Sequence, residues 1–219
     1  MNPEIPVEYE KGYTEFLNCK IDLRNRVFIP RIETEFWVKK AIKELSSLKE
    51  RLKVLDIFAG SGCIGIAVLK NVKNSLVDFI DNDKKAIEQI EINLKINKIS
   101  KSRYRIFRSN LFEGLRNKKY DIIFANPPYV AKEKLKEVQP SVLKYEPKRA
   151  VLAGKKGLFY IRKFLKEVKK FLKPDGVIYL EFDPEQKNEI SNILKKENYK
   201  NSKFFKDQFK KYRFVKVQI

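Results

Sequence analysis

The sequence predicts an α/β fold in which helices cover both faces of a mainly parallel β-sheet. Short apolar runs typical of buried strands alternate along the chain with segments whose apolar residues recur every three or four positions. A glycine-rich turn lies between the first such strand and the first such helix. The chain has 219 residues, of which 43% are apolar and 35% charged, and this suits one domain with or without a small extension.

Seven strands are expected, each a short run bounded by turn residues. They span residues 53–58, 75–80, 104–107, 120–125, 177–182, 199–205 and 212–217. The last two are joined too tightly for a crossover and should pair antiparallel. The others suit parallel pairing, because helical segments separate them.

Four helices are expected in this alternating part, over residues 63–69, 84–96, 157–172 and 185–197. The helix over 157–172 has the clearest pattern, because Leu158, Ile161, Leu165, Val168 and Leu172 recur at spacings of three and four. Residues 173–176 then predict a turn before the fifth strand.

The first 50 residues predict a smaller extension. Residues 13–29 alternate as a β-hairpin does, and residues 35–48 carry one apolar helix face with Thr34 as a possible N-cap. A boundary near residues 49–53 would divide the chain into an extension over 1–50 and a main domain over 51–219.

Composition excludes several classes of chemistry. The chain has no histidine, which removes histidine bases and most zinc catalysis, and Cys19 and Cys63 lack the spacing of a metal or disulfide framework. No apolar run could span a membrane or act as a signal peptide, and together with the two isolated cysteines this predicts a reducing cytoplasm. We also expect a monomer. The net charge of +20 has two interpretations: attraction to RNA, ribosomes or another acidic partner, or a lysine-rich composition without a function.

The glycine-rich turn indicates a ligand site. Gly60 and Gly62 let the backbone approach a ligand closely, and the helix that begins at Cys63 offers free N–H groups. Taken alone, the turn also suits an ordinary strand-to-helix connection. Polar residues at the next two strand ends, Asp81 and Asn110, favour a ligand that contains a nucleoside. An acidic side chain at such a strand end accepts hydrogen bonds from ribose hydroxyls.

An acidic residue before the turn helps to distinguish S-adenosylmethionine from NAD as the ligand. Asp56 suits a ligand with a cationic end, such as the ammonium group of a methionine moiety. Dinucleotide-binding turns instead usually have three glycines and lead a pyrophosphate to the helix. The sequence therefore favours S-adenosylmethionine over NAD.

The fourth strand ends in Asn126-Pro127-Pro128-Tyr129, a candidate catalytic loop. The two prolines fix the backbone and leave carbonyl acceptors beside the side-chain oxygen of Asn126. Two fixed acceptors would bind a planar –NH₂ group and aim its nitrogen at an electrophilic methyl, so orientation and desolvation replace a strong base. The alternative is a rigid strand-end turn with a structural tyrosine. The loop resembles that of amino-methyltransferases, whose targets are adenine N6, guanine N2 or a glutamine amide.

The flanking segments narrow this resemblance. The chain resembles the release-factor glutamine-N5 methyltransferases (the PrmC/HemK family) in segments that follow one another in the family's order. They are PVEY (6–9), FIPRIETE (28–35), QPSV (139–142), YEP (145–147), LKPDG (172–176), and EF (181–182) followed by Gln186.

The resemblance implies a Rossmann-like class I methyltransferase fold and methylation of the glutamine amide in the Gly-Gly-Gln loop of a peptide chain release factor. It implies that Asn126 and the Pro127 carbonyl hold the amide, with Pro128 and Tyr129 beside it, and that Glu33 and Thr34 close over the site; a helix N-cap is the alternative role of these two. The implied contacts of S-adenosylmethionine are Asp56, Phe58, Ala59, Gly60, Ser61, Gly62, Asp81, Asn110, Leu111 and Asn126.

Three departures from the family pattern affect these expectations. The chain has almost nothing in place of the small helical domain that usually precedes PVEY and helps to bind the release factor. Its turn reads DIFAGSG, not DLGTGSG, and Asn110 stands where an aspartate is common. The alternative function is therefore a nucleic-acid amino-methyltransferase acting on ribosomal RNA guanine N2 or on adenine N6, which shares the loop but not the flanks.

Overall fold

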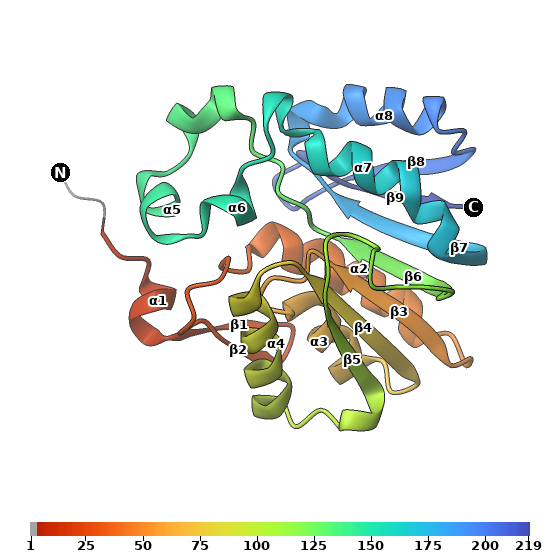
Figure 1. Ribbon diagram of the computed structural model, residues 1–219, viewed down its shortest axis with the longest axis horizontal. Coiled ribbons are helices and arrows are strands. Elements are labelled where there is room, and N and C mark those ends of the chain that lie inside the picture. Colours follow the sequence, from red (N-terminus) through yellow and green to blue (C-terminus); the bar gives the residue numbers. More distant parts are fainter. Residues whose placement is uncertain (1–3) are drawn as a thin grey trace.

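The computed structural model describes residues 4–219 and has one seven-stranded sheet at its centre (Figure 1). The strand order is β5-β4-β3-β6-β7-β9-β8. Strands β3 to β7 pair in parallel, and β9 is antiparallel to both β7 and β8. The predicted α/β class, with a mainly parallel sheet and an antiparallel C-terminal strand, is confirmed. The strands are β3 Leu52–Ile57, β4 Ser75–Asp81, β5 Tyr104–Arg108, β6 Tyr120–Ala125, β7 Leu172–Glu181, β8 Asn201–Lys206 and β9 Tyr212–Gln218.

Helices cover both faces of the sheet because its central strands are apolar on both sides. Val54 of β3 belongs to the core on one face, whereas Leu55 and Ile57 belong to the core on the other. The first face packs against α2 (Ile32–Ser46), α3 (Cys63–Asn71) and α4 (Lys84–Ile96); the second packs against α7 (Phe159–Glu167) and α8 (Lys187–Lys196). The period-2 alternation of strand side chains produces this two-layered core.

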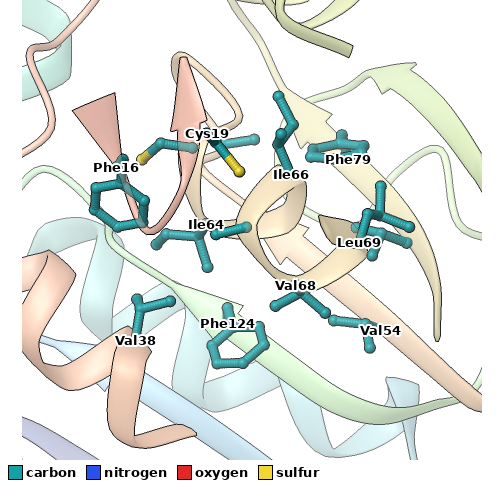
Figure 2. Close-up of a cluster of buried hydrophobic side chains, with 14 of the residues drawn as sticks. Phe16, Cys19, Val38, Val54, Ile64, Ile66, Val68, Leu69, Phe79 and Phe124 are labelled. Atoms are coloured by element: carbon teal, nitrogen blue, oxygen red, sulfur yellow. The ribbon is translucent and has the colours of Figure 1, made fainter. Parts of the chain in front are cut away.

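The N-terminal segment shares the first of these cores. It contains α1 (Val7–Lys11) and a separate hairpin of β1 (Tyr13–Phe16) and β2 (Cys19–Asp22). Phe16 and Cys19 of the hairpin lie close to Val38 of α2 and to the buried side chains of α3 and the sheet (Figure 2).

Side-chain amides of α4 attach this hairpin to the sheet layer. Asn93 accepts from the Asp22 N–H (2.8 Å) and donates to the Asp22 carbonyl (3.2 Å). Asn97, one turn further on, makes the same pair of bonds with Lys20. The two amides thus form hydrogen bonds with the backbone N–H and C=O groups at the outer edge of β2, as a neighbouring strand would.

Four details of the sequence prediction are wrong. The hairpin ends at Asp22, and residues 23–29 run as a loop that buries Leu23, Val27 and Ile29. Helix α2 begins at Ile32, so Thr34 lies inside its first turn and is not an N-cap. Helix α7 ends at Glu167 and continues as the 3₁₀ turn η4 (Val168–Phe171). The turn predicted at 173–176 lies within β7, where the register with β6 shifts between Tyr120 and Ile122.

Residues 130–157, here called the cap segment, connect the loop after β6 to α7. The segment contains η2 (Lys132–Glu137), α5 (Pro140–Tyr145), α6 (Lys148–Val151) and η3 (Lys155–Gly157). Its two ends are joined, because Val130 donates to the Val151 carbonyl (2.9 Å) and accepts from the Ala153 N–H (3.0 Å). Helices α5 and α6 stand beside the sheet on the same side as α1 (Figure 1).

The remaining short elements are η1 (Lys101–Arg103) before β5 and η5 (Pro184–Gln186) before α8. Within residues 4–219, no helix has the length and apolar character needed to cross a bilayer.

Candidate active site

A cavity of about 290 Å³ opens at the carboxyl ends of β3, β4 and β6. The chain order reverses between β3 and β6, and this is where open parallel sheets bind ligands. The loops after four strands line the cavity, together with the segment before α2 and the cap segment. The parts that line it include Val27, Phe28, Pro30 and Arg31, the turn from Phe58 to Ser61, Asp81 to Asp83, Ser109 to Leu111, Asn126 to Val130, and Val138, Val142, Pro147, Arg149 and Ala150.

Most of the predicted cofactor residues come together here. Those that line the cavity are Phe58, Ala59, Gly60, Ser61, Asp81, Asn110, Leu111 and Asn126. Asp56 and Gly62 lie outside the cavity lining. Gly62 instead begins α3 as its N-cap with a φ of 77°, where its N–H bonds the Ala59 carbonyl at 2.7 Å.

Asp56 is buried behind the glycine-rich turn. Its carboxylate accepts a hydrogen bond from the Gly65 N–H at 2.8 Å, and only 1% of the residue is exposed. Burial raises the pKa of Asp56 to about 8, against the smaller lowering effect of the Gly65 bond. The carboxyl group therefore supports the first turn of α3 from below.

Asp81 supports the same turn from the neighbouring strand. One of its carboxylate oxygens accepts from the Gly60 N–H (2.8 Å) and the other from the Asp83 N–H (2.9 Å). Burial raises the pKa of Asp81, and these two backbone bonds oppose the shift. Each carboxylate oxygen can accept a second bond, so Asp81 can still bind ribose hydroxyls.

The turn also contains a strained backbone position. Phe58 has a φ of 60°, a left-handed conformation that costs a residue with a Cβ about 1 kcal/mol. Its ring contacts Tyr160 edge-on, with centroids 6.0 Å apart, and Tyr160 also lines the cavity. The sequence did not indicate Tyr160 as a site residue, because it lies within a predicted helix and not at a strand end.

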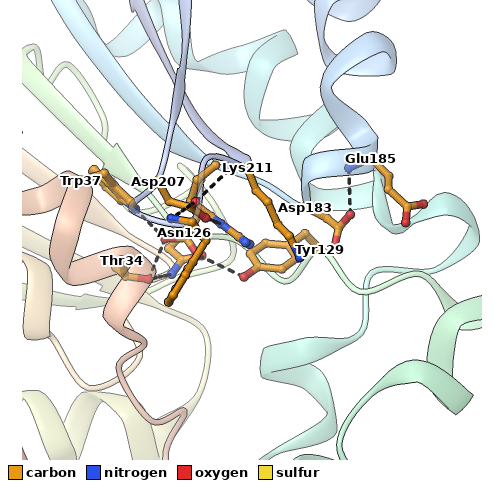
Figure 3. Close-up of polar contacts among 11 residues, drawn as sticks. Thr34, Trp37, Asn126, Tyr129, Asp183, Glu185, Asp207 and Lys211 are labelled. Carbon is orange, nitrogen blue, oxygen red and sulfur yellow. Dashed lines mark hydrogen bonds and ion pairs between the residues drawn. The ribbon is translucent and has the colours of Figure 1, made fainter.

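The loop Asn126-Pro127-Pro128-Tyr129 lines the cavity with all four residues. The Asn126 side chain donates from Nδ2 to the Thr34 hydroxyl at 3.4 Å, and the Tyr129 hydroxyl donates to Glu181 at 3.1 Å. These side chains converge with Trp37 in Figure 3. The loop is thus bound to α2 and to β7 at once.

Glu181 is the group that sequence reasoning missed. It ends β7, is 1% exposed, and accepts hydrogen bonds from Thr34 Oγ1 (2.7 Å) and Trp37 Nε1 (2.6 Å) in addition to Tyr129. Burial raises the pKa of Glu181, and the Thr34 and Trp37 bonds oppose the shift. The only signal in the sequence was its place in the EF segment, which carries no chemistry by itself.

The two predicted substrate residues in the first turn of α2 are placed differently. Thr34 is buried and lines the cavity, whereas Glu33 lies outside the lining. The neighbouring Arg31 lines the cavity and pairs with the buried Glu146 of the cap segment, which also accepts from the Ile29 N–H. This ion pair connects the segment before α2 to the cap.

A second ion pair closes the cap over the other side of the cavity. Arg149 of α6 contacts Asp83, the N-cap of α4, at 2.7 Å. Gln186 then holds the base of the cap, because its Nε2 donates to the carbonyls of Tyr129 (2.8 Å) and Lys156 (3.0 Å). The cap therefore forms one wall of the cavity.

The strand order, the glycine-rich turn beside Asp81 and the Asn-Pro-Pro-Tyr loop define a class I S-adenosylmethionine-dependent methyltransferase. A family model described as "Methyltransferase small domain" matches residues 38–154. Release factor glutamine methyltransferases from Flavobacterium psychrophilum and Clostridium botulinum are 36% and 31% identical, each over 98% of this chain and over 75% and 76% of the relative. The chain belongs to the family of release factor glutamine methyltransferases.

Other relatives extend these comparisons. The enzyme of the same name from Fusobacterium nucleatum is 34% identical over 92% of this chain and 56% of its own length. Among solved structures, the hMettl16 catalytic domain in complex with an RNA hairpin superposes with a TM-score of 0.72 at 14% identity, covering 97% of this chain and 77% of that one. The T. thermophilus 16S rRNA N2 G1207 methyltransferase gives 0.66 at 16% identity, covering 94% and 49%. At these identities the structures establish the shared fold alone.

Proposed function

We propose that this protein methylates the side-chain amide nitrogen of the glutamine in the Gly-Gly-Gln loop of a peptide chain release factor. One observation carries the proposal: the side chain of Asn126 stands in the cavity beside the glycine-rich turn, in a chain of the release factor glutamine methyltransferase family. When bound, S-adenosylmethionine supplies an electrophilic methyl group on a sulfonium.

The cavity residues fit this cofactor. The backbone of Gly60 and Ser61 lies open to the ligand, Asp81 offers carboxylate oxygens, and Phe58 and Leu111 offer apolar surface. These are the groups that a ribose, an adenine and a methionine moiety require. Asp56, buried below the turn, would act on the ligand only by supporting the turn through its bond with the Gly65 N–H.

The loop would bind the glutamine amide through two acceptors. Asn126 Oδ1 and the Pro127 carbonyl oxygen would each accept one N–H of the –NH₂ group, so that the nitrogen lone pair is directed at the methyl. Tyr129 and Pro128 would exclude water around the amide. No general base is needed before attack, which agrees with a chain that lacks histidine.

A nucleic-acid amino-methyltransferase is the second candidate, and the net charge of +20 favours it. Its substrate would be guanine N2 of ribosomal RNA or adenine N6. The sequence flanking the loop opposes this candidate, because it follows the release-factor family.

Under either function we propose that the protein is a monomer and is located in the cytoplasm. We further propose that residues 1–50 form an extension and residues 51–219 the methyltransferase domain. Residues 1–3 of the extension lie outside the described residues.

The test is a labelled-methyl transfer assay that offers purified release factor, ribosomal RNA and DNA separately. We expect label on the release factor and none on a release factor whose Gly-Gly-Gln glutamine is changed to alanine. Label that appears only on RNA or DNA would replace the proposed function with the second candidate.

A further inference from the structure

We propose that Glu181 and Thr34 are positioning residues that fix the side-chain amide of Asn126 with its oxygen toward the cavity. The role of this pair in turnover rests on the proposed function, whereas its effect on the orientation of Asn126 does not. Three contacts carry the argument: Trp37 to Glu181, Thr34 to Glu181, and Asn126 to Thr34 (Figure 3).

These three hydrogen bonds form a series that begins at Trp37. An indole N–H can only donate, so the Glu181 oxygen 2.6 Å away must accept. The same oxygen, Oε2, lies 2.7 Å from the Thr34 hydroxyl. An ionised carboxylate oxygen can only accept, so the hydroxyl donates its single proton to Glu181.

The orientation of Asn126 is the next step. With its proton engaged, the Thr34 oxygen can only accept from a further partner. The amide of Asn126 must therefore direct its –NH₂ group to Thr34, as it does at 3.4 Å. Its Oδ1 atom then points away from Thr34 and is free to accept a hydrogen bond from a substrate.

This control matters because the two amide orientations have almost the same shape. An asparagine turned by 180° fills the same space but would present –NH₂ to a substrate –NH₂, and two donors cannot bond. Packing cannot distinguish the orientations, so a polar partner must. Glu181 is buried and tied to α2, to β7 and to the loop, and it is rigid enough to set this direction.

The test begins with Thr34→Val, which keeps the shape of the side chain and removes the acceptor. We expect turnover to fall about ten- to a hundredfold, the scale for losing one buried hydrogen bond to a polar partner. Affinity for S-adenosylmethionine, measured by calorimetry, should change much less. Thr34→Ser keeps the hydroxyl and should restore most of the turnover.

A double-mutant cycle separates positioning from direct substrate contact. If Thr34 acts only through Asn126, Thr34→Val should have little further effect in an Asn126→Ala background. An equal factor in both backgrounds would overturn the proposal and assign Thr34 a contact of its own with the substrate. Wild-type turnover in Thr34→Val would overturn it as well.

A spectroscopic measurement is independent of the substrate. The side-chain amide resonances of Asn126, assigned by their loss in Asn126→Ala, should shift in Thr34→Val and return in Thr34→Ser. Unmoved resonances in Thr34→Val would refute the Thr34–Asn126 link even in a folded and active enzyme. If instead the release factor is not methylated by the wild-type protein while the resonances shift as expected, the proposed substrate fails and the positioning role stands.

Discussion

Asp56 shows how a residue chosen for one role is placed for another. The sequence suggested that its carboxylate faces a cationic ligand, whereas the structure buries it under the turn, on the Gly65 N–H. Burial raises its pKa to about 8, well above the value of about 4 of an unfolded aspartate. The folded protein thus keeps a proton that the unfolded chain releases, and the associated stability is full below about pH 4 and lost as pH rises through 8.

Asp56→Asn should therefore stabilise the protein more at high pH than at low pH. The amide oxygen can still accept from Gly65, and it carries no charge that must be desolvated. We expect the gain in the free energy of unfolding over wild type to be larger at pH 8 than at pH 4.5, by a few kcal/mol. Urea unfolding of the cofactor-free protein at the two pH values measures this difference.

The matched control is Asp175→Asn, on an exposed residue whose φ of 62° asparagine also tolerates. Its effect should be the same at both pH values. An equal effect of Asp56→Asn at pH 4.5 and 8 would mean that the buried carboxyl is already ionised in acid.

The positions of residues around the cavity were predictable where backbone geometry or a motif determines them. The turn residues Gly60 and Ser61 and the loop from Asn126 to Tyr129 line one cavity, as the strand ends indicated. Thr34 and Glu181 act through side-chain hydrogen bonds between segments 147 residues apart. No local pattern encodes such a pair, because its partners meet only once the sheet and α2 have packed.

At the scale of elements, the junction between the loop from Asn126 to Tyr129 and the cap segment depends on Gly157. A Cβ at this position would overlap the Tyr129 carbonyl oxygen and lie 2.5 Å from Gln186 Nε2. Those two groups are hydrogen-bonded to each other at 2.8 Å, so neither can move without the other. Gly157 also has a φ of 66°, which a residue with a side chain rarely adopts.

Gly157→Ala should displace the loop and lower turnover about a hundredfold, because a shift of about 1 Å in a positioning element has this scale of effect. The loss in the free energy of unfolding should be about 1–3 kcal/mol. Single-turnover kinetics and thermal unfolding provide the two measurements.

Gly154→Ala is the control for backbone strain. Gly154 has a φ of 68°, but the nearest atom to its added Cβ would be 3.9 Å away. With a ψ of −152° as well, it lies in a region that essentially only glycine adopts, so the variant should lose about 1–3 kcal/mol of stability and keep its turnover. Equal turnover losses in the two variants would attribute the effect to strain and remove the loop contact from the mechanism.

Among the helices and strands, the sequence predicted the long elements with a clear apolar pattern and missed the short ones. Strands β3, β4 and β6 were predicted almost to their ends, because buried parallel strands are continuous apolar runs. The helix over 157–172 was correct in its apolar face but not in its last turn, where Leu172 enters β7. Helices α5 and α6 were missed because they have only six and four residues, too few for a helical period to be visible.

The charge of the whole molecule is far from balanced, with 48 basic and 28 acidic residues. Exposed lysines occur both in the cap segment, such as Lys132, Lys136 and Lys148, and at the amino ends of the strands. The sequence left open whether this excess attracts a partner or reflects composition. The position of the lysines relative to the cavity now allows the two interpretations to be distinguished.

If the charge steers an acidic partner to the cavity, kcat/KM should fall about tenfold or more as salt rises from about 0.01 to 0.15 M, since the Debye length shortens from about 30 to about 8 Å. Turnover at saturating release factor should stay constant, because steering acts on encounter and not on the methyl transfer.

Changing Lys132, Lys136 and Lys148 together to glutamine should flatten the salt dependence, because these residues belong to the segment that lines the cavity. The matched triple change of Lys49, Lys73 and Lys119, exposed just before β3, β4 and β6 at the opposite edge of the sheet, should leave the slope near that of the wild type. Equal slopes in the two triple variants would show that only net charge matters, and a flat wild-type profile would assign the lysine excess to composition.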